Sequence, residues 1–473
     1  MQITRRAVTA GLIAAPALLR RVPALAALPS LPPIDARDVT FVRPGDALYD
    51  QYLPAYNLRT ELRPALRAMC RTAKGVAQTI AWLRDKNIPF ALRSGGHCFE
   101  GFSQSTSVVV DTRLMNDVSV RDSALTVGAG ASLGQVYQVI SPLGMAFPGG
   151  SCPTVGVSGH TLGGGFGLLA RSRGLACDVL QAIELIDANG KTVLASATQN
   201  ADLFWACRGG GGGTFGAATR FHFSIAPIGK VTTFGVTWNL PERQAVALFA
   251  AWEAWAPDAP RDITALLRIS KRKDGLIDLH CFGQSEGTAR ALRRELKALL
   301  DVAKPQTAPD IRAMSAMAAV NHFAGSWDYV SQYSKGKSDF ITAPLSTAGV
   351  EALIGGIAAL PPGEVLAICD AHGGAVHDTA PDATAFAYRA GTSFCIQYYT
   401  GWTKPASGGP HMQDLRTLYA AMRPWSGGAY VNYCDTDISD WRKAYWRQNL
   451  PRLRAIKAKV DPGNFFRHAQ SVT

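Results

Sequence analysis

A histidine and a cysteine stand side by side after two glycines in the first quarter of the chain, in the segment RSGGHCFEG. The histidine is His97 and the cysteine is Cys98. Because glycine has no Cβ, a histidine among glycines is typical of a place where a large group lies close against the backbone. The group that this segment holds is therefore a metal, a substrate or a cofactor.

Two more glycine-rich segments follow, GGSCPTVGVSGHTLGGGFGLL at residues 149–169 and RGGGGGTFGAAT at residues 208–219. Several loops of this kind offer unhindered backbone N–H groups to a pyrophosphate. A nicotinamide dehydrogenase is disfavoured, because no strand–GxGxxG–helix unit opens the chain and no acidic residue follows at the expected spacing. Tight turns of a sheet protein are the alternative interpretation of these glycines.

Length and composition are those of an ordinary globular protein. The 473 residues are enough for two or three packed units, and 47% hydrophobic with 18% charged residues argues against disorder. The formal net charge is +12, but no basic run is interleaved with aromatic residues. We therefore expect a basic surface and no nucleic-acid partner.

The N-terminal segment, MQITRRAVTAGLIAAPALLRRVPALAALPS, has the features of an export signal. A twin arginine precedes a modestly apolar run, and a small-x-small cleavage site lies at residues 24–26. This predicts a Tat-type signal peptide over residues 1–26, recognised by the Tat export machinery, and a periplasmic or secreted protein. A Sec signal is the alternative, and the run is too short and too arginine-rich for stable membrane insertion.

The nine cysteines form no CxxC pair, which gives a structural zinc site little support. An exported protein can form disulfides, but an odd number of cysteines leaves one over. They are Cys70, Cys98, Cys152, Cys177, Cys207, Cys281, Cys369, Cys395 and Cys434.

The glycine clusters stop near residue 228, and the pattern then changes. Before that point, residues 72–92 read as a helix followed by a strand, and AIELIDANGKTVLA reads as a hairpin with an Asn-Gly turn. After it, strands (TTFGVTWNL, GLIDLHCFG, SFCIQYYTGW) alternate with helices (ERQAVALFAAWEAWA, TARALRRELKALL). This predicts an α+β unit whose antiparallel sheet carries helices on one face. An amphipathic helix is expected near DWRKAYWRQNLPRLRAIKAKV.

Five motifs occur in one order along the mature chain: RSGGH, CPTVGVSGHTLGGGFG, DLFWACRGGGGGTFGAAT, YVNYCD and DPGNFFRHAQSV. With them the sequence resembles the berberine-bridge-enzyme-like oxidases of the vanillyl-alcohol-oxidase flavoprotein superfamily. The resemblance implies an α+β fold with a two-part PCMH-type FAD-binding domain at residues 55–228. It further implies a substrate domain at 229–425, with an antiparallel sheet covered by helices, and a berberine-bridge-like segment at 426–473 that returns to the FAD domain.

The resemblance also implies a bicovalently bound FAD. His97 would bond the 8α-methyl group and Cys152 would bond C6, which accounts for the odd cysteine and leaves Cys98 as a neighbour. His160 would lie at the pyrimidine end of the ring, and Val155 would control the access of oxygen. The matching cofactor-binding residues are Arg93, Ser94, Gly95, Gly96, His97, Cys98, Cys152, Val155, Gly156, Ser158, Gly159, His160, Gly163, Gly164, Gly165, Gly167 and Asn432.

On the substrate side, the resemblance places Tyr433 in the role of the base that takes the substrate's hydroxyl proton, with Tyr430 beside it. A phenol with a pKa of about 10 needs assistance at neutral pH. Asp370 or His372 would assist, and Gln397 would line the same cavity. Many relatives have a tyrosine two positions after the flavin-linking histidine, but this chain has Phe99, which offers no proton.

The expected function is that of an exported FAD-dependent oxidase, which oxidises the anomeric hydroxyl of a sugar or oligosaccharide and reduces O2 to H2O2. The alternatives are an oxidoreductase or dehydrogenase acting on a secondary metabolite, a flavin-free binding protein, and a metalloprotein using His97, Cys98, Cys152 and His160. Aromatic residues that would stack on a sugar are Trp327, Tyr329, Tyr398, Tyr399 and Trp402.

Overall fold

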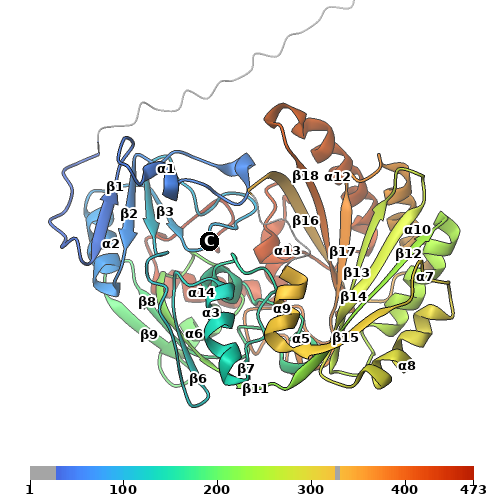
Figure 1. The fold of residues 1–473 in the computed structure, drawn as a ribbon. Helices are drawn as coiled ribbons and strands as arrows, with labels where there is room; N and C mark the ends of the chain where they lie inside the picture. Colours follow the sequence, from blue (N-terminus) through green and yellow to red (C-terminus); the bar gives the residue numbers. More distant parts are fainter. Residues whose placement is uncertain (1–27, 325–330) are drawn as a thin grey trace, which may run out of the picture. The chain divides into compact units, whose positions relative to one another are not determined.

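Four β-sheets organise the part of the chain that the computed structural model describes, residues 28–324 and 331–473. Residues 32–473 form one compact unit (Figure 1). The expected signal peptide, residues 1–26, lies outside the described residues. Within them, no helix combines the length and the apolar character that crossing a bilayer demands.

The first sheet is mixed, with the strand order β1-β2-β4-β3. β2 and β3 both pair with β4 in parallel, and β1 pairs with β2 in antiparallel fashion. The helix and strand predicted at residues 72–92 are confirmed, and the helix begins at a side-chain cap, where Thr72 Oγ1 accepts a hydrogen bond from Gly75 N at 3.0 Å. The elements are β1 (Val39–Val42), α1 (Tyr49–Tyr52), β2 (Leu66–Cys70), α2 (Ala73–Asp85), β3 (Phe90–Arg93) and β4 (Val108–Asp111).

The second sheet has five antiparallel strands in the order β5-β6-β10-β8-β9. β8 and β9 form the predicted hairpin, whose turn needs a glycine because Gly190 has a φ of 75°. Its strands are β5 (Val118–Arg121), β6 (Ala124–Gly128), β8 (Leu180–Ile186), β9 (Thr192–Ser196) and β10 (Ala217–Ser224). The elements around it are α3 (Leu133–Ile140), β7 (Met145–Ala146), α4 (Val157–Leu162), α5 (Ala170–Arg173), α6 (Ala201–Ala206) and β11 (Ala226–Pro227).

The third large sheet has seven strands, all antiparallel, in the order β15-β12-β14-β13-β17-β18-β16. α7, α8, α10 and α12 pack on one of its faces (Figure 1), as the sequence predicts. Its strands are β12 (Lys230–Leu240), β13 (Ile263–Lys271), β14 (Ile277–Ser285), β15 (Asp310–Ser315), β16 (Tyr333–Ile341), β17 (Leu366–Ala371) and β18 (Phe394–Trp402). The helices are α7 (Glu242–Trp255), α8 (Ala289–Leu300), α9 (Ala316–Ala324), α10 (Thr347–Ala359), α11 (Ala375–Asp378) and α12 (Gly408–Met422).

Alternation along the central strands gives this sheet two different faces. On β17, Ala367 and Cys369 belong to the core beneath the helices, whereas Ile368 and Asp370 line a pocket on the other face. Because successive side chains of a strand point to opposite faces, a single strand contributes both to the core and to the pocket. The sheet therefore presents a wall of side chains to the glycine-rich loops.

The C-terminal segment has two helices where the sequence analysis expected one, α13 (Trp441–Trp446) and α14 (Leu450–Val460). The helix is interrupted because Arg447 has a φ of 46° and Pro451 stands in the first turn of α14, where a proline is tolerated. Beyond the break, Lys457 Nζ donates to Thr214 O in the third glycine-rich segment at 2.6 Å.

A buried ion network joins β16 to two distant segments. Lys335 Nζ lies 2.6 Å from Glu100 Oε1, which follows the RSGGH motif, and 2.6 Å from Asp435 Oδ1, which follows the YVNY motif. Lys337 Nζ lies 2.6 Å from the other oxygen of Asp435. All four side chains are at most 3% exposed, so water does not screen these charges.

We expect Asp435→Ala to lower the free energy of unfolding by about 3 kcal/mol, because the two buried ammonium groups lose their shared carboxylate. The loss is at the lower end for a broken buried pair, since Lys335 keeps Glu100 and Lys337 keeps Asp437 at 2.9 Å. Urea denaturation of the holoprotein measures the change. The matched control is Asp202→Ala, which breaks the exposed pair with Arg452 and should cost about 0–1 kcal/mol. Equal losses in the two variants would contradict this account of the network.

Candidate active site

A pocket of about 710 Å³ brings most of the predicted site residues together. Its volume is in the range of cofactor and ligand sites. Its walls come from the glycine-rich loops, from β17 and β18, and from the YVNY segment. The predicted residues that line it are Arg93, Ser94, Gly95, Gly96, His97, Cys98, Cys152, Val155, Gly156, Ser158, Gly159, His160, Gly167, Asp370, Gln397, Tyr430, Asn432 and Tyr433.

Three predicted cofactor residues, Gly163, Gly164 and Gly165, do not line the pocket but support it from behind. A Cβ on Gly163 would lie 2.1 Å from Asn432 Oδ1, so the glycine lets the asparagine come close. The amide of Gly165 donates to Tyr430 Oη at 3.0 Å. These glycines therefore fix the position of the YVNY segment against α4.

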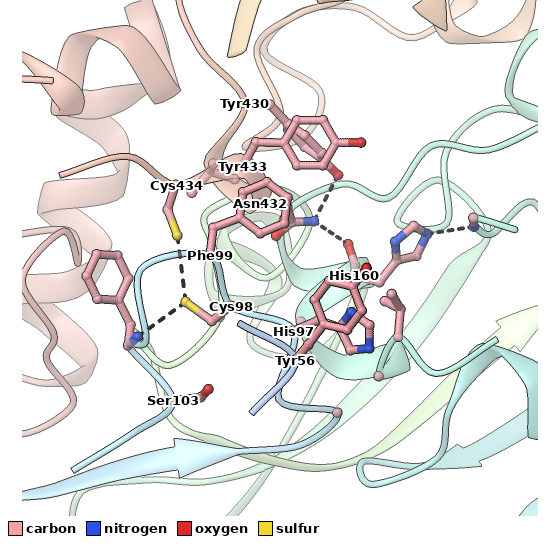
Figure 2. A pocket seen from close by; sticks show the side chains of 18 of the residues that line it. Tyr56, His97, Cys98, Phe99, Ser103, His160, Tyr430, Asn432, Tyr433 and Cys434 are labelled. Atoms are coloured by element: carbon pink, nitrogen blue, oxygen red, sulfur yellow. Dashed lines mark hydrogen bonds between the residues drawn. The ribbon is translucent and has the colours of Figure 1, made fainter. Parts of the chain in front are cut away.

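The side chain of His97 is held from two sides. Nε2 is hydrogen-bonded to Thr154 Oγ1 at 2.9 Å, and the ring stacks on Tyr56 with centroids 4.3 Å apart (Figure 2). Burial, and after it the charge of Arg93, lowers the pKa of His97 to about 4. His97 is thus a neutral imidazole at neutral pH, and its Nδ1 makes no hydrogen bond to a described residue.

Cys152 belongs to the same wall as His97, two residues before Thr154. Burial first, and then a set of electrostatic interactions that includes one with Cys152, raises the pKa values of Tyr56 and Tyr433. The sulfur is therefore close to residues on both sides of the pocket.

His160, on α4, is the second neutral imidazole of the site. Its Nε2 accepts a hydrogen bond from Gly150 N at 3.1 Å, and burial lowers its pKa to about 4. Because Nε2 is the acceptor, the single ring proton is on Nδ1. The backbone carbonyl of His160 also accepts a hydrogen bond from Asn432 Nδ2 at 3.0 Å.

The RSGGH loop has the chemistry of an anion-binding site. The backbone N–H groups of Gly95, Gly96 and His97 donate to no acceptor among the described residues. Gly95 packs so closely on Gly156 that a Cβ would lie 2.3 Å from its nitrogen, which keeps side chains away from the loop. Free amides at a loop of this kind attract negative charge.

Buried arginines add positive charge next to this loop. Arg93 lines the pocket and is 3% exposed, and its Nε and Nη1 lack hydrogen-bond partners among the described residues. Arg67 and Arg113 lie 2.7 and 2.8 Å from Asp111, while Arg93 is 3.9 Å from the same carboxylate. Three guanidinium groups around one carboxylate leave an excess of positive charge that favours an anionic ligand.

The opposite wall carries the predicted catalytic residues. The carboxyl group of Asp370, on β17, makes no hydrogen bond to a described residue, and burial raises its pKa to about 7. Burial first, and then the charge of Asp370, raises the pKa of Tyr433 well above its ordinary value. The ring of Tyr433 stacks on Phe99 with centroids 5.4 Å apart (Figure 2). A carboxylate and a phenol thus face the pocket together.

Tyr430 was predicted as a catalytic neighbour, but its hydroxyl group has a supporting position. Its oxygen accepts hydrogen bonds from Gly165 N at 3.0 Å and from Asn432 Nδ2 at 2.8 Å.

His372, considered as a partner of Tyr433, does not line the pocket and is 2% exposed. Its ring lies edge-on to Phe166 and Phe340, and burial lowers its pKa to about 3.

The aromatic residues expected to stack on a sugar are divided. Tyr399 and Trp402 line the pocket, whereas Tyr398 is buried towards the helices and donates to Asp339 Oδ2 at 3.1 Å. Trp327 and Tyr329 lie outside the described residues.

Sequence analysis did not identify Tyr56, Thr154 or Gln332, which come to the pocket or its histidine only through the fold. Among the described residues, no group of three or more His, Cys, Asp and Glu side chains is placed to hold a metal ion.

Comparison with known proteins gives the family. The FAD binding domain family matches residues 64–196, and the berberine and berberine-like family matches residues 429–473. The chain is 32% identical to the FAD-linked oxidoreductase YgaK of Bacillus subtilis over 434 residues, 90% of this chain and 95% of that protein. It is 33% identical to the monolignol oxidoreductase AtBBE-like 13 of Arabidopsis thaliana over 426 residues, 80% and 78% of the two chains.

The chain belongs to the berberine-bridge-enzyme-like family of FAD-linked oxidoreductases. Solved structures agree, with a TM-score of 0.86 and 27% identity to Physcomitrella patens BBE-like 1, over 93% of this chain and 97% of that one. The TM-score is 0.83 both for the glucooligosaccharide oxidase of Acremonium strictum, at 28% identity, and for a chitooligosaccharide oxidase, at 26%. Each alignment covers 92% of this chain and 97% of the other. The predicted superfamily and fold class are confirmed.

The pocket residues fit FAD. The amides at Gly95–His97 and the charge of Arg93 suit the diphosphate, and a pocket of about 710 Å³ lined by His97, His160 and Tyr433 has room for a ring system. The glycine-rich loops and Arg93 would thus hold the cofactor in the pocket that Asp370 and Tyr433 also line.

We expect Gly159→Val to reduce the flavin content about tenfold or more without weakening the fold. A Cβ at Gly159 meets no protein atom within 4 Å, so the new side chain extends into the pocket, where crowding typically costs about 1–3 kcal/mol. Flavin absorbance relative to protein measures the loading. Gly229→Val, outside the pocket and equally unhindered, is the control and should load fully. Full loading of the Gly159 variant would exclude this wall from the FAD site.

Proposed function

We propose that the protein is an FAD-dependent oxidase with the flavin bonded to both His97 and Cys152, which oxidises an alcohol and reduces O2 to H2O2. One observation carries the proposal. His97 and Cys152 line one wall of a pocket whose other wall presents Asp370 and Tyr433. When bound, FAD supplies the acceptor for a hydride from the substrate carbon and passes the electrons to oxygen.

The state of His97 supports its role as an attachment point. A neutral imidazole has a lone pair to form a bond, and burial keeps the ring neutral. Because Thr154 engages Nε2, Nδ1 is the nitrogen available for the link. The glucooligosaccharide oxidase of Acremonium strictum has a 6-S-cysteinyl, 8α-N1-histidyl FAD, and we propose the same pair of bonds here.

Two residues tune the site for oxidation. His160 offers its Nδ1–H to negative charge at the pyrimidine end of the ring, since its Nε2 is occupied by Gly150. Val155 lines the pocket with a short side chain, and we propose that it leaves space for O2 to reach the ring. Because the side chain of Val155 is small, we propose an oxidase and not a dehydrogenase.

Asp370 takes the substrate's hydroxyl proton on its carboxylate in our proposal, and Tyr433 orients the hydroxyl by hydrogen bonding. A carboxyl group with a pKa of about 7 is substantially ionised at neutral pH and is a stronger base than an ordinary aspartate. Tyr433 keeps its proton, because burial and the Asp370 charge both disfavour the phenolate. This exchanges the roles that the sequence analysis gave to the two residues.

The substrate that we propose is a sugar or oligosaccharide, oxidised at its anomeric hydroxyl. Tyr399 presents a ring, and Gln397 and Gln332 present amides, in the same pocket. Trp402 also lines the pocket, but it is 6% exposed and its ring stacks on those of Tyr333 and His411. Two structural neighbours are named as oxidases of chitooligosaccharides and glucooligosaccharides.

A second candidate substrate is an aromatic alcohol of secondary metabolism. The apolar side chains of Leu266, Phe282 and Ile368 line the same pocket, and a relative at 33% identity is named a monolignol oxidoreductase. We also propose export through the Tat route after FAD insertion, on the basis of the twin arginine at Arg5 and Arg6.

A substrate panel with a peroxide readout tests the function. Air-saturated holoprotein should form H2O2 with oligosaccharides that have a free anomeric hydroxyl and not with aromatic alcohols. Peroxide from aromatic alcohols alone would move the assignment to the second candidate. Reduction of the flavin by substrate with no peroxide would contradict the oxidase.

We expect Asp370→Asn to lower kcat/KM about 10²–10⁴-fold, because the amide accepts no proton. In the unaltered protein, kcat/KM should fall about tenfold per pH unit below pH 7 and level off above it, since the ionised carboxylate is the active form. Stopped-flow reduction without oxygen measures both. Asp339→Asn is the matched control. Burial also raises the pKa of Asp339 to about 7, but this residue lies outside the pocket. A pH profile that survives in the Asp370 variant would remove Asp370 from the role of base.

A further inference from the structure

Two cysteines that the reaction does not use meet at the edge of the active site. Cys98 follows His97, and Cys434 follows Tyr433, 336 residues further along the chain. Their sulfur atoms are 3.6 Å apart and hydrogen-bonded, and both residues line the pocket (Figure 2). The residues that follow His97 and Tyr433 in the sequence are therefore in contact with each other through their sulfur atoms.

The two sulfurs differ in reactivity. The hydrogen bond from the Cys434 thiol lowers the pKa of Cys98 to about 7, and backbone N–H groups, including that of Phe102 at 3.2 Å from the sulfur, act in the same direction against burial. The same contact and burial raise the pKa of Cys434 well above its ordinary value. Cys98 is therefore the thiolate and Cys434 the thiol, which is the arrangement of an attacking and a resolving cysteine.

The buried ion network holds the two cysteines in place. Glu100, two residues after Cys98, and Asp435, one residue after Cys434, both bind the ammonium of Lys335 at 2.6 Å. Cys434 is 5% exposed, and Asp435 beside it is completely buried. Closing the bond requires the sulfurs to approach from 3.6 Å to about 2.05 Å.

We propose that Cys98 and Cys434 are a modification site, a thiol pair that hydrogen peroxide oxidises to a disulfide between the His97 segment and the Tyr433 segment. The Cys98 thiolate attacks one oxygen of H2O2, the O–O bond breaks, and the hydroxide that leaves takes a proton and becomes water. Cys98 is then a sulfenic acid. The Cys434 sulfur attacks the Cys98 sulfur, the S–O bond breaks, and a second water leaves with the thiol proton.

The balance is two thiols and one H2O2 to one disulfide and two waters, with two electrons passing from sulfur to peroxide. Only the natural source of the peroxide depends on the proposed function, since an oxidase would form it in the adjoining pocket. The disulfide would fasten together the segments that carry a flavin-linking residue and a substrate-facing residue.

The test uses the reduced holoprotein, freed of reductant and treated with a small excess of added H2O2 before alkylation and tryptic digestion. Residues 94–113 and 417–442 are tryptic peptides with one cysteine each, Cys98 and Cys434. We expect a loss of two titratable thiols per chain. Peptide 417–442 should be detected in a disulfide-linked species with peptide 94–113, and a reductant should release it. This holds whether or not peptide 94–113 also carries flavin.

Two variants sharpen the test. Cys434→Ser should lose one thiol and give a sulfenic-acid adduct on Cys98 with dimedone, because no resolving thiol remains. Cys70→Ser, at another buried cysteine, should still lose two thiols and form the link. Two alkylated, unlinked cysteines after peroxide treatment of the unaltered protein would overturn the proposal, as would a link from Cys98 to any other cysteine.

A separate experiment tests the source of the peroxide. Turnover with substrate and O2 replaces added H2O2, and formation of the same link supports the pair and the oxidase together. A link that forms with added H2O2 but not during turnover supports the pair and contradicts the proposed oxidase as its source.

Discussion

A single buried ammonium group, that of Lys335, connects the three segments on which the active site depends. It lies between Glu100, after the RSGGH loop, and Asp435, after the YVNY segment, and the lysine itself belongs to the edge strand β16. Removing an ion from water costs several kcal/mol unless its partners are present. The network is therefore complete only when the loops, the large sheet and the C-terminal segment are all in their native positions, and the pocket forms with them.

Within that framework, burial has opposite effects on the two walls. It lowers the pKa values of His97 and His160 to about 4, and it raises that of Asp370 to about 7. The imidazoles are thereby neutral at neutral pH, so that each has a lone pair to form a bond and an N–H group to donate a hydrogen bond. The carboxyl group, in contrast, becomes a better base. One physical cause, the loss of water, thus shifts the pKa values of the two walls in opposite directions, as the roles that we propose for them require.

Much of the site follows from the sequence, because glycine spacing marks the backbone that approaches a ligand and the motifs of RSGGH and YVNY place their side chains beside it. The antiparallel sheet and its helices follow from periodicity. The contacts of His97 do not follow from the sequence. Tyr56 lies outside every motif, and Thr154, although it belongs to the CPTVG motif, meets the imidazole only in the folded chain. The same holds for Lys335, which resembles a surface lysine in sequence, and for the break at Arg447, where the amphipathic pattern continues through a positive φ.

The central claim, that one flavin is fastened at His97 and Cys152 beside Asp370 and Tyr433, is tested most directly by peptide mass spectrometry of denatured, active protein. Trypsin places His97 in residues 94–113 and Cys152 in residues 122–171. The account predicts one flavin-containing species in which both peptides are joined through the cofactor. Both peptides at their unmodified masses, in protein that still turns over substrate, would contradict it.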